Sequence, residues 1–449
     1  MPTDYPGLGS EKVALLMVGL PARGKSYVAR KVAGYLSWLG SRTRVFNVGA
    51  YRRQRLGGRQ THEFFDPANQ ESRRVRRELA LGVLDEMLGW LRTDGDVAIY
   101  DATNTTRDRR TVVRERCQAA GVRVVYVESI CDDPSIIAAN VRETKLRSPD
   151  YAGMDAESAV RDFETRIAHY ARAYEPVADD EGSYVKLIDV GRKVVANRMV
   201  GWLASRLVSF LMNVHTARST IWLTRHGESE FNVEGRIGGD SGLTERGELF
   251  ARSVRDFLEA RLGVTSTVSV WTSTMRRSIE TSAFLPWRAT RLRALDEIDA
   301  GVCDGMTYAQ IAERMPEEYA ARADDKLRYR YPRGESYQDI IQRLDPVIID
   351  LERQRAPLVV IGHLAVTRTL YGYLMQIPRE RCPHLDIPLH TMLELTPTAY
   401  GVEERRHPLE PQPDPRRPSF AGFRSPVARE PSEPGASGTG SGSGSSTPR

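Results

Sequence analysis

The sequence of 449 residues is poor in cysteine, with four in all and no Cys-x-x-Cys pair. This scarcity disfavours a disulfide framework and a tetrahedral zinc site, and it is typical of a reducing, cytoplasmic setting. Long apolar runs are also missing, because the longest, at 13–18 and 358–361, are far shorter than the ~20 residues that span a bilayer. The first ten residues lack the basic region of a secretory signal. We expect a cytoplasmic protein without membrane contact.

A large excess of one charge is absent as well. Lysine and arginine number 64 against 59 acidic residues, so the formal net charge is only +5. A nucleic-acid-binding surface needs a much stronger basic excess, and we expect no nucleic-acid partner. Hydrophobic residues make up 41% and charged residues 27%, which is typical of a soluble globular protein. The length suits two large domains or three smaller ones.

The first half of the chain alternates between strand-like and helix-like patterns, which is the rhythm of a doubly wound α/β domain. Short apolar runs predict strands at 13–18, 44–48, 97–100, 122–130 and 184–190. Apolar residues at helical spacing predict helices at 25–39, 71–92, 107–120, 155–175 and 194–213.

A second α/β series follows, with no repeat that links it to the first. Its predicted strands are 219–224, 268–271 and 358–361, and its predicted helices are 244–261, 275–284, 307–323 and 336–354. We therefore expect one domain at 1–215 and another at 216–403. The remaining segment, 404–449, is rich in Pro, Gly and Ser and has too few apolar residues to order itself, so we expect a disordered tail.

A phosphate-binding loop lies between the first predicted strand and helix. Residues 19–26 read GLPARGKS and match the pattern G-x-x-x-x-G-K-[ST]. Backbone N–H groups of such a loop wrap a polyphosphate, Lys25 reaches its β and γ oxygens, and Ser26 ligates Mg²⁺. Asp101 follows another predicted strand, where it is placed either to hold Mg²⁺ or to accept a proton. Alone, an aspartate there is more often a helix cap or turn former.

An arginine cluster lies between the second predicted strand and the following helix. Its members are Arg52, Arg53, Arg73, Arg74, Arg76 and Arg77. Two interpretations stay open: a solvated basic face, or a site for a phosphorylated acceptor beside the phosphate loop.

The second half carries two histidines at the ends of predicted strands. Residues 225–227 read Arg-His-Gly, and His363 follows the strand at 358–361. A neutral imidazole there can attack phosphorus, with Arg225, Arg276 and Arg277 neutralising the phosphoryl oxygens, whereas the alternative is a satisfied core histidine. A phosphatase also needs a general acid. Of Asp296, Glu297 and Asp299 we favour Glu297, although the sequence separates the three poorly.

Together these motifs resemble the bifunctional 6-phosphofructo-2-kinase/fructose-2,6-bisphosphatase family. The resemblance runs from about residue 11 to 402 and rests on GLPARGKS (19–26), FNVGAYRR (46–53), YDATNTTRDRR (100–110), VESICDDP (127–134), KLRSPDY (145–151), LTRHGESEFN (223–232), GRIGGD (235–240), EIDAGVCDGMTY (297–308), YRYPRGESY (329–337) and IPLHTMLELTPTAYG (387–401). It implies a P-loop kinase domain with a mostly parallel sheet, followed by a phosphoglycerate-mutase-like histidine phosphatase domain.

The resemblance also implies the chemistry. The kinase half would make fructose 2,6-bisphosphate from ATP, Mg²⁺ and fructose 6-phosphate, and the phosphatase half would hydrolyse it through a phosphohistidine, which sets a signal between glycolysis and gluconeogenesis. A homodimer is compatible with the family. In the tail, Arg416-Arg417-Pro418-Ser419 has the form of a site for a basophilic protein kinase.

In the kinase half, the resemblance places Asp101, Cys131 and Lys145 at the catalytic centre, with Ser26 and Asp101 on the metal. The implied nucleotide contacts are Gly19, Gly24, Lys25, Ser26, Asn140 and Lys145, and the implied fructose 6-phosphate contacts are Arg52, Arg76, Thr103, Arg109, Arg166 and Tyr170.

In the phosphatase half, the resemblance makes His226 the nucleophile and Glu297 the proton donor. The implied phosphate pocket is Arg225, Asn232, Arg277 and His363, and the implied further sugar-bisphosphate contacts are Gly238, Tyr308, Arg322, Lys326, Tyr337 and Arg368. One position departs from the family pattern, because Leu364 stands where a glutamine is usual after His363. Leucine cannot hydrogen-bond, so we expect a weakened phosphatase.

Two other hypotheses compete with the bifunctional sugar-phosphate enzyme. One is a kinase–phosphatase that acts on nucleic-acid ends, which the near-balanced charge and the lack of aromatics among the arginines oppose. The other is a regulatory binding module with one or both sites inactive. This hypothesis is opposed by the intact residues Lys25, Asp101, His226 and His363. Leu364 nevertheless leaves open an inactive phosphatase site. It also leaves open a member of the family in which the kinase activity is the stronger one.

Overall fold

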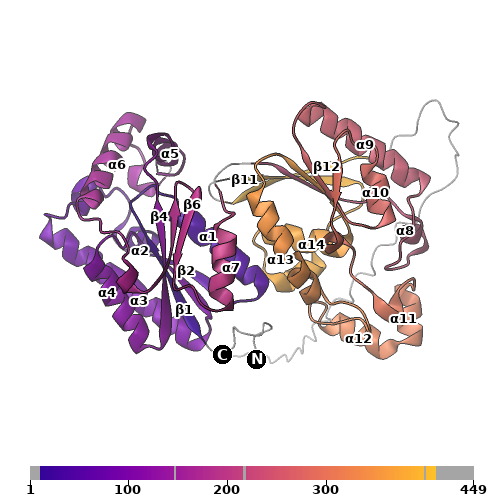
Figure 1. The fold of residues 1–449 in the computed structure, drawn as a ribbon, viewed down its shortest axis with the longest axis horizontal. Coiled ribbons are helices and arrows are strands. Elements are labelled where there is room, and N and C mark those ends of the chain that lie inside the picture. Colours follow the sequence, from indigo (N-terminus) through magenta and orange to yellow (C-terminus); the bar gives the residue numbers. More distant parts are fainter. Residues whose placement is uncertain (1–10, 146–147, 216–218, 399–400, 411–449) are drawn as a thin grey trace, which may run out of the picture.

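The computed structural model of the chain describes residues 11–145, 148–215, 219–398 and 401–410, and within these it holds two six-stranded sheets (Figure 1). The strands are β1 (Lys12–Val18), β2 (Thr43–Asn47), β3 (Val97–Asp101), β4 (Val122–Ile130), β5 (Ser183–Ile188), β6 (Lys193–Asn197), β7 (Ile221–Arg225), β8 (Ser269–Thr272), β9 (Ala289–Arg291), β10 (Leu358–Gly362), β11 (Thr391–Pro397) and β12 (Val402–Pro408).

The α-helices are α1 (Lys25–Leu39), α2 (Val48–Leu56), α3 (Gln70–Thr93), α4 (Arg107–Ala119), α5 (Pro134–Asn140), α6 (Ala156–Ala171), α7 (Trp202–Leu211), α8 (Glu230–Glu234), α9 (Glu245–Leu262), α10 (Arg276–Ser282), α11 (Tyr308–Arg314), α12 (Pro316–Asp324), α13 (Tyr337–Arg353) and α14 (Leu364–Leu374). Short turns of other helix types are η1 (His62–Phe65), η2 (Val141–Lys145), η3 (Pro149–Tyr151), η4 (Asp179–Glu181), η5 (Arg293–Leu295), η6 (Gly301–Cys303) and η7 (Arg379–His384). No helix in the described segments is long and apolar enough to cross a bilayer.

The first sheet has the order β2-β3-β1-β4-β5-β6. All neighbours are parallel except β6, which runs antiparallel to β5 at the edge. Strand β1 lies inside the sheet between β3 and β4, and six of its seven residues are buried. This explains its continuous apolar run, because a parallel strand covered by helices on both faces has no solvent side. The loops after β1, β2 and β3 therefore meet at one edge.

The second sheet has the order β12-β11-β7-β10-β8-β9. Strands β7, β10, β8 and β9 are parallel, whereas β11 and β12 are antiparallel additions. The carboxyl ends of β7, β10 and β8 lie next to each other, and the predicted phosphatase residues follow these strands. The predicted α/β fold class is confirmed for both halves.

Helix α1 joins the two halves. Figure 1 shows it beside α7, between the first sheet and helix α13 of the second half. One apolar cluster contains residues of β1, α1, α7, α13 and α14, so the core is continuous across the boundary. Within it the Tyr35 ring of α1 stacks on Phe210 at 4.2 Å, and its hydroxyl donates to Asp345 of α13 at 2.6 Å. Arg206 of α7 pairs with the same carboxylate at 2.7 Å.

Further polar contacts cross the same interface. Lys31 of α1 pairs with Glu352 at 2.8 Å, and the Tyr373 hydroxyl donates to that carboxylate at 2.7 Å. The Trp38 indole donates to the carbonyl oxygen of Thr369 at 3.2 Å. The buried polar groups of the interface are thus paired, which fixes how the two halves pack.

Two predicted helices are wrong in part. The segment 194–213 begins as strand β6, because Val194 pairs with Leu187 of β5 and its β-branched side chain suits a sheet; helix α7 begins only at Trp202. The segment 307–323 is two helices, α11 and α12. Pro316 lacks an N–H group and disfavours a helical conformation in Met315, which separates them.

The predicted start of the tail at 404 is also wrong. Strand β12 runs across it to Pro408 and pairs with β11 along its whole length. The prediction of disorder beyond this strand, including the site at Ser419, falls on 411–449, outside the described residues. The other predicted strands and helices are present, with small shifts of their ends.

The interface predicts a difference between two aspartates of α13. Asp345→Ala removes the buried carboxylate that pairs Tyr35 and Arg206, so we expect the free energy of unfolding to fall by about 1–3 kcal/mol. Asp350→Ala is the control, because its ion pair with Arg353 is exposed and should contribute less than about 0.5 kcal/mol. Urea unfolding of the full chain followed by tryptophan fluorescence checks both. If the two variants lost the same free energy of unfolding, the buried contacts of Asp345 would not stabilise the interface as described.

Candidate active sites

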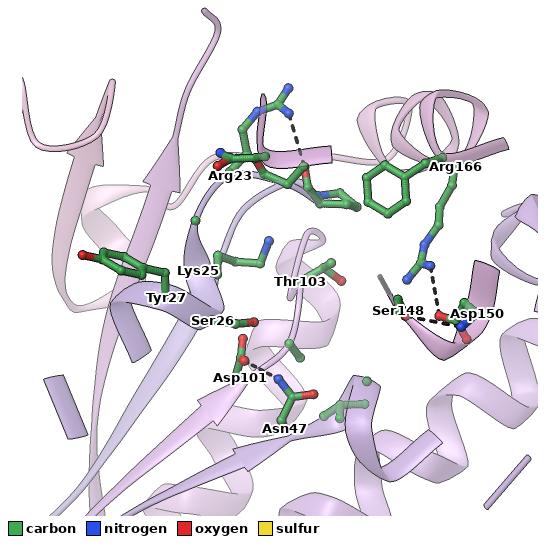
Figure 2. A pocket seen from close by; sticks show the side chains of 18 of the residues that line it. Arg23, Lys25, Ser26, Tyr27, Asn47, Asp101, Thr103, Ser148, Asp150 and Arg166 are labelled. Carbon is green, nitrogen blue, oxygen red and sulfur yellow. Dashed lines mark hydrogen bonds and ion pairs between the residues drawn. The ribbon is translucent and has the colours of Figure 1, made fainter. Parts of the chain in front are cut away.

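A cavity of about 810 Å³ opens at the carboxyl ends of the first sheet, and Figure 2 shows part of its lining. The lining brings together the phosphate loop, the ends of β2 and β3, and residues of α3, α5 and α6. It includes the predicted residues Gly24, Lys25, Ser26, Arg52, Arg76, Asp101, Thr103, Arg109, Asn140, Arg166 and Tyr170. Segments more than a hundred residues apart thus converge on one site, as the resemblance implied.

The phosphate loop is shaped by its glycines and presents the N-terminus of α1. Gly24 has a φ of 83° and directly precedes the helix, a conformation that glycine adopts without strain. Lys25 is buried at 7% exposure, and its ammonium donates to the Leu20 carbonyl oxygen at 2.5 Å. A cation and a row of N–H groups at the start of a 15-residue helix form an anion site.

The Mg²⁺ ligands that the sequence predicted lie together. Ser26 is the second residue of α1 and Asp101 ends β3; Figure 2 shows their oxygen atoms facing each other. A hydroxyl and a carboxylate are the hard oxygen ligands that Mg²⁺ prefers, so these residues fit the ion. Asn47 at the end of β2 donates to Asp101, a contact that the sequence did not reveal. The only signal was its place at a strand end.

The acceptor side of the cavity holds arginines around one buried acid. Arg52 is ion-paired to Asp150. Arg166 approaches the same carboxylate at 3.6 Å, as Figure 2 shows. The Arg166 guanidinium also lies 3.5 Å from the centre of the Phe65 ring, a cation–π contact. Asp150 lies in the quoted motif KLRSPDY, but from the sequence we assigned neither Asp150 nor Phe65 a role in the site. Bound arginines of fixed geometry suit a phosphate group.

The remaining residues predicted to contact fructose 6-phosphate come from the loop after β3 and from α3, α4 and α6. Arg76 donates to the carbonyl oxygens of Phe65 and Asp66, and Arg109 donates to the side-chain oxygen of Asn104 at 3.2 Å. Thr103 and Tyr170 also line the cavity, and the Tyr170 side chain interacts with Arg76. The arginine cluster divides: Arg52, Arg53 and Arg76 line the cavity, whereas Arg73, Arg74 and Arg77 are exposed. The cluster thus contributes both to a solvated face and to the cavity wall, and binding of a phosphorylated acceptor stays a prediction.

Two predicted kinase residues, Gly19 and Cys131, are not among the residues that line the cavity. Gly19 lies behind it, where a Cβ would overlap the Ser129 carbonyl oxygen, so this glycine permits the close approach of two strands. Cys131 is buried after β4, and burial raises the pKa of its thiol, which favours the protonated form. Lys145 ends η2, and its side chain lies outside the described part of the structure.

A second site lies at the carboxyl ends of β7, β10 and β8. His226 follows β7 and His363 follows β10; both are buried, and their ring centres are 5.0 Å apart. His226 Nδ1 lies 2.7 Å from the Gly227 carbonyl oxygen. A carbonyl oxygen can only accept a hydrogen bond, so Nδ1 carries the proton of the ring. Its lone pair is therefore on Nε2, which receives a hydrogen bond from Arg277 Nε at 3.1 Å. This is a neutral nucleophile beside a cation.

The electrostatics keep both rings neutral. Burial, together with Arg277 and Arg225, lowers the pKa of His226 well below its usual value of 6.5. Burial, together with His226 and Arg277, does the same to the pKa of His363. A protonated imidazole has no lone pair for attack, so this environment favours the reactive form.

The three candidate acids are now distinguishable. Asp296 accepts hydrogen bonds from the backbone and hydroxyl of Thr274, and Asp299 accepts one from Gly301, so both shape their own loops. Glu297 accepts from the N–H of Ala365 at 3.2 Å, two residues beyond His363. This contact brings Glu297 close to His363, and its role as the general acid stays a prediction.

The predicted phosphate pocket has further members around His226. Arg225 donates to the Ile387 carbonyl oxygen at 3.2 Å. Asn232 uses its side-chain oxygen to cap α8, because it accepts from the N–H of Ser229 at 3.0 Å. Gly238 has a φ of 69°, and a Cβ there would overlap an Asp304 oxygen. The glycine thus lets the loop pass close to its neighbour.

Four of the residues predicted to contact the sugar bisphosphate are joined by hydrogen bonds in two groups. Arg322 donates to the hydroxyls of Tyr308 and Tyr331 at 2.8 and 2.9 Å. Arg368 donates to the Tyr337 hydroxyl at 3.4 Å, and burial raises the pKa of Tyr337 to about 12. Lys326 is half-buried just beyond α12. The structure joins the predicted residues in these pairs, and Tyr331 is a partner that the sequence did not indicate.

The fold and the two sites define an α/β chain that pairs a P-loop kinase domain with a histidine phosphatase domain. A 6-phosphofructo-2-kinase family model matches residues 4–218, and a model of the histidine phosphatase superfamily (branch 1) matches residues 221–408. The chain belongs to the 6-phosphofructo-2-kinase/fructose-2,6-bisphosphatase family.

Three relatives of that name support this assignment. The chain is 47% identical to the enzyme of Aquarana catesbeiana over 89% of this chain and 86% of the relative, and 46% identical to form 1 of Homo sapiens over 89% and 85%. It is 47% identical to the Arabidopsis thaliana protein over 88% of this chain, but it spans only 54% of that relative's length.

The buried histidines lead to a prediction about pH. Because the pKa of His226 is depressed in the fold, its imidazole should stay neutral as the pH falls from 7.5 through 6.5, where an exposed histidine gains a proton. A pH titration of the full chain labelled with ¹⁵N-histidine, with His226 assigned from a His226→Gln variant, measures this. A midpoint near 6.5 would contradict the described environment.

Proposed function

We propose that this chain both synthesises fructose 2,6-bisphosphate from ATP and fructose 6-phosphate and hydrolyses it. The observation that carries the proposal is the presence in one chain of two different phosphoryl-transfer sites. One is a cavity with a phosphate loop, an acid and paired arginines; the other is a buried histidine pair with Arg277.

In the kinase site, the loop and Lys25 bind the ATP phosphates. Ser26 and Asp101 would hold Mg²⁺, which neutralises charge that develops on the transferring group. Arg52 and Arg166 bind the phosphate of the acceptor sugar and thereby fix the position of its 2-hydroxyl. The proton of that hydroxyl leaves toward Asp101, the acid that faces the loop.

In the phosphatase site, Nε2 of His226 attacks the phosphorus of the 2-phosphate. A nitrogen–phosphorus bond forms, the bond to the sugar oxygen breaks, and Glu297 gives that oxygen a proton. Arg225, Arg277 and His363 surround the phosphoryl oxygens. Water then attacks the phosphohistidine, with Glu297 as the base, and releases inorganic phosphate.

The setting that we propose is the cytoplasm. All four cysteines are buried and carry free thiols, which supports a reducing compartment. The homodimer and the protein kinase that acts on Ser419 stay predictions from the sequence.

Reciprocal variants test the assignment of one activity to each half. Lys25→Ala should lower ATP-dependent synthesis by about a hundredfold or more, because it removes charge stabilisation in the transition state, and should leave hydrolysis within about twofold. His226→Ala should abolish hydrolysis and spare synthesis. The measurements are formation and loss of fructose 2,6-bisphosphate by each purified full-length variant.

If the wild-type chain showed neither synthesis nor hydrolysis of fructose 2,6-bisphosphate, the proposed function would be refuted. Loss of both activities in one folded variant would contradict separate sites. Arg74→Ala is a useful comparison for Lys25→Ala, because Arg74 is an exposed cation of the kinase half that does not line the cavity, and its loss should cost much less synthesis.

Leu364 favours a kinase-biased member of the family. It is the first residue of α14, directly after His363, and its side chain packs against the apolar core. An apolar group at this position offers no hydrogen bond to a substrate oxygen, whereas the kinase cavity keeps its predicted residues. We therefore propose that synthesis exceeds hydrolysis.

The substitution Leu364→Gln measures this bias. It should raise the phosphatase kcat/KM about five- to a hundredfold at low substrate, which corresponds to the roughly 1–3 kcal/mol of an unpaired polar group, with synthesis unchanged. Leu364→Met is the matched control, because it keeps an apolar side chain of similar size. No gain with glutamine would mean that the site is built around leucine.

A further inference from the structure

Ser273 makes a buried hydrogen bond to the second histidine of the phosphatase site. It directly follows β8, and His363 directly follows the parallel neighbour β10, in which Ile361 is in register with Thr272. The serine Oγ lies 2.7 Å from His363 Nε2, and neither side chain is exposed to solvent. The register of the two strands thus sets this contact.

The direction of the hydrogen bond follows from the other contact of the hydroxyl. Ser273 Oγ accepts from the N–H of Met275 at 3.2 Å, and within the described residues the imidazole is its one other partner. If His363 donated from Nε2, the hydroxyl hydrogen would be buried without an acceptor, which is costly. If the hydroxyl donates to Nε2 instead, both its hydrogen and its oxygen have a hydrogen-bond partner. His363 then carries its proton on Nδ1.

His363 Nδ1 is buried, and no described residue hydrogen-bonds to it. The charged groups acting on the ring are Arg277, Arg225 and Arg343, which are hydrogen-bond donors and cannot accept from an N–H. The ring adjoins His226, the nucleophile, with 5.0 Å between ring centres. An N–H here therefore needs an acceptor from outside the protein, and an anionic oxygen is the chemistry that the surrounding cations favour.

We propose that Ser273 is a positioning residue whose hydroxyl holds His363 with its proton on Nδ1, where it donates to an oxygen of the phosphoryl group transferred to His226. The inference rests on the proposed phosphatase function. His363 transfers no proton in this scheme. It supplies a neutral donor that strengthens as charge gathers on the phosphoryl oxygens, while Ser273 prevents the ring from turning or adopting the other tautomer.

The tautomer is measurable without any substrate. Long-range ¹H–¹⁵N correlation spectra of the unliganded, ¹⁵N-histidine-labelled full chain should show a protonated Nδ1 and an unprotonated Nε2 for His363, assigned by its loss in His363→Gln. In Ser273→Ala this preference should weaken or reverse. Ser278→Ala is the matched control, because its buried hydroxyl donates to the Ile361 carbonyl oxygen and touches neither histidine.

The kinetic test separates positioning from general structure. Ser273→Ala should slow phosphorylation of His226 about ten- to hundredfold in single-turnover experiments with fructose 2,6-bisphosphate, with little change in KM. Synthesis by the same chain, in the other half, reports that the protein is folded. Ser273→Thr keeps the hydroxyl and should recover most of the rate.

Two outcomes would overturn the proposal: a wild-type His363 protonated on Nε2, or a Ser273→Ala variant with the wild-type rate of phosphoryl transfer. The wild-type spectrum shows the tautomer of His363 and therefore tests the proposal even if Ser273→Ala does not fold. Failure of the wild-type chain to form phosphohistidine would instead refute the proposed function, whatever the tautomer of His363.

Discussion

Burial of helix α1 between the two halves is the constraint on which the rest of the structure depends. Its first turn carries Lys25 and Ser26 and so forms one wall of the kinase site, whereas its later turns place Tyr35 and Trp38 against α13 and α14. Burial of each large apolar side chain in such a core stabilises the fold by about 1.5–3 kcal/mol. The helix cannot shift at one end without disturbing the other. The phosphate loop is therefore held by the second domain as well as by its own.

Both sites use the carboxyl ends of parallel strands, but the electrostatics differ. The kinase cavity is open and holds arginines on the buried carboxylate of Asp150, which suits charged substrates that enter and leave. The phosphatase site seals two neutral imidazoles among arginines, which suits a nucleophile that must keep its lone pair. Under the proposed function, the same topology thus serves one transfer that uses a metal ion and one that passes through a covalent intermediate.

The sequence predicted those parts of the sites that are written in short contiguous motifs. The phosphate loop and Arg225-His226 each lie at the end of an apolar run, so strand and function could be inferred together. Asp150 and Ser273 act through partners on distant segments, and although Asp150 lies in the motif KLRSPDY, the sequence does not show which side chains these two residues meet. The strand β6 was missed for a related reason, since its valines suit a helix face or a sheet edge, and pairing with β5 decides.

The most direct test follows one phosphoryl group through both sites. The wild-type chain is given ATP labelled in its γ-phosphate together with Mg²⁺ and fructose 6-phosphate, and samples are quenched over time. The account predicts label first in fructose 2,6-bisphosphate, then on His226, and last in inorganic phosphate. Label on the protein without fructose 6-phosphate, or none in the sugar bisphosphate, would contradict it.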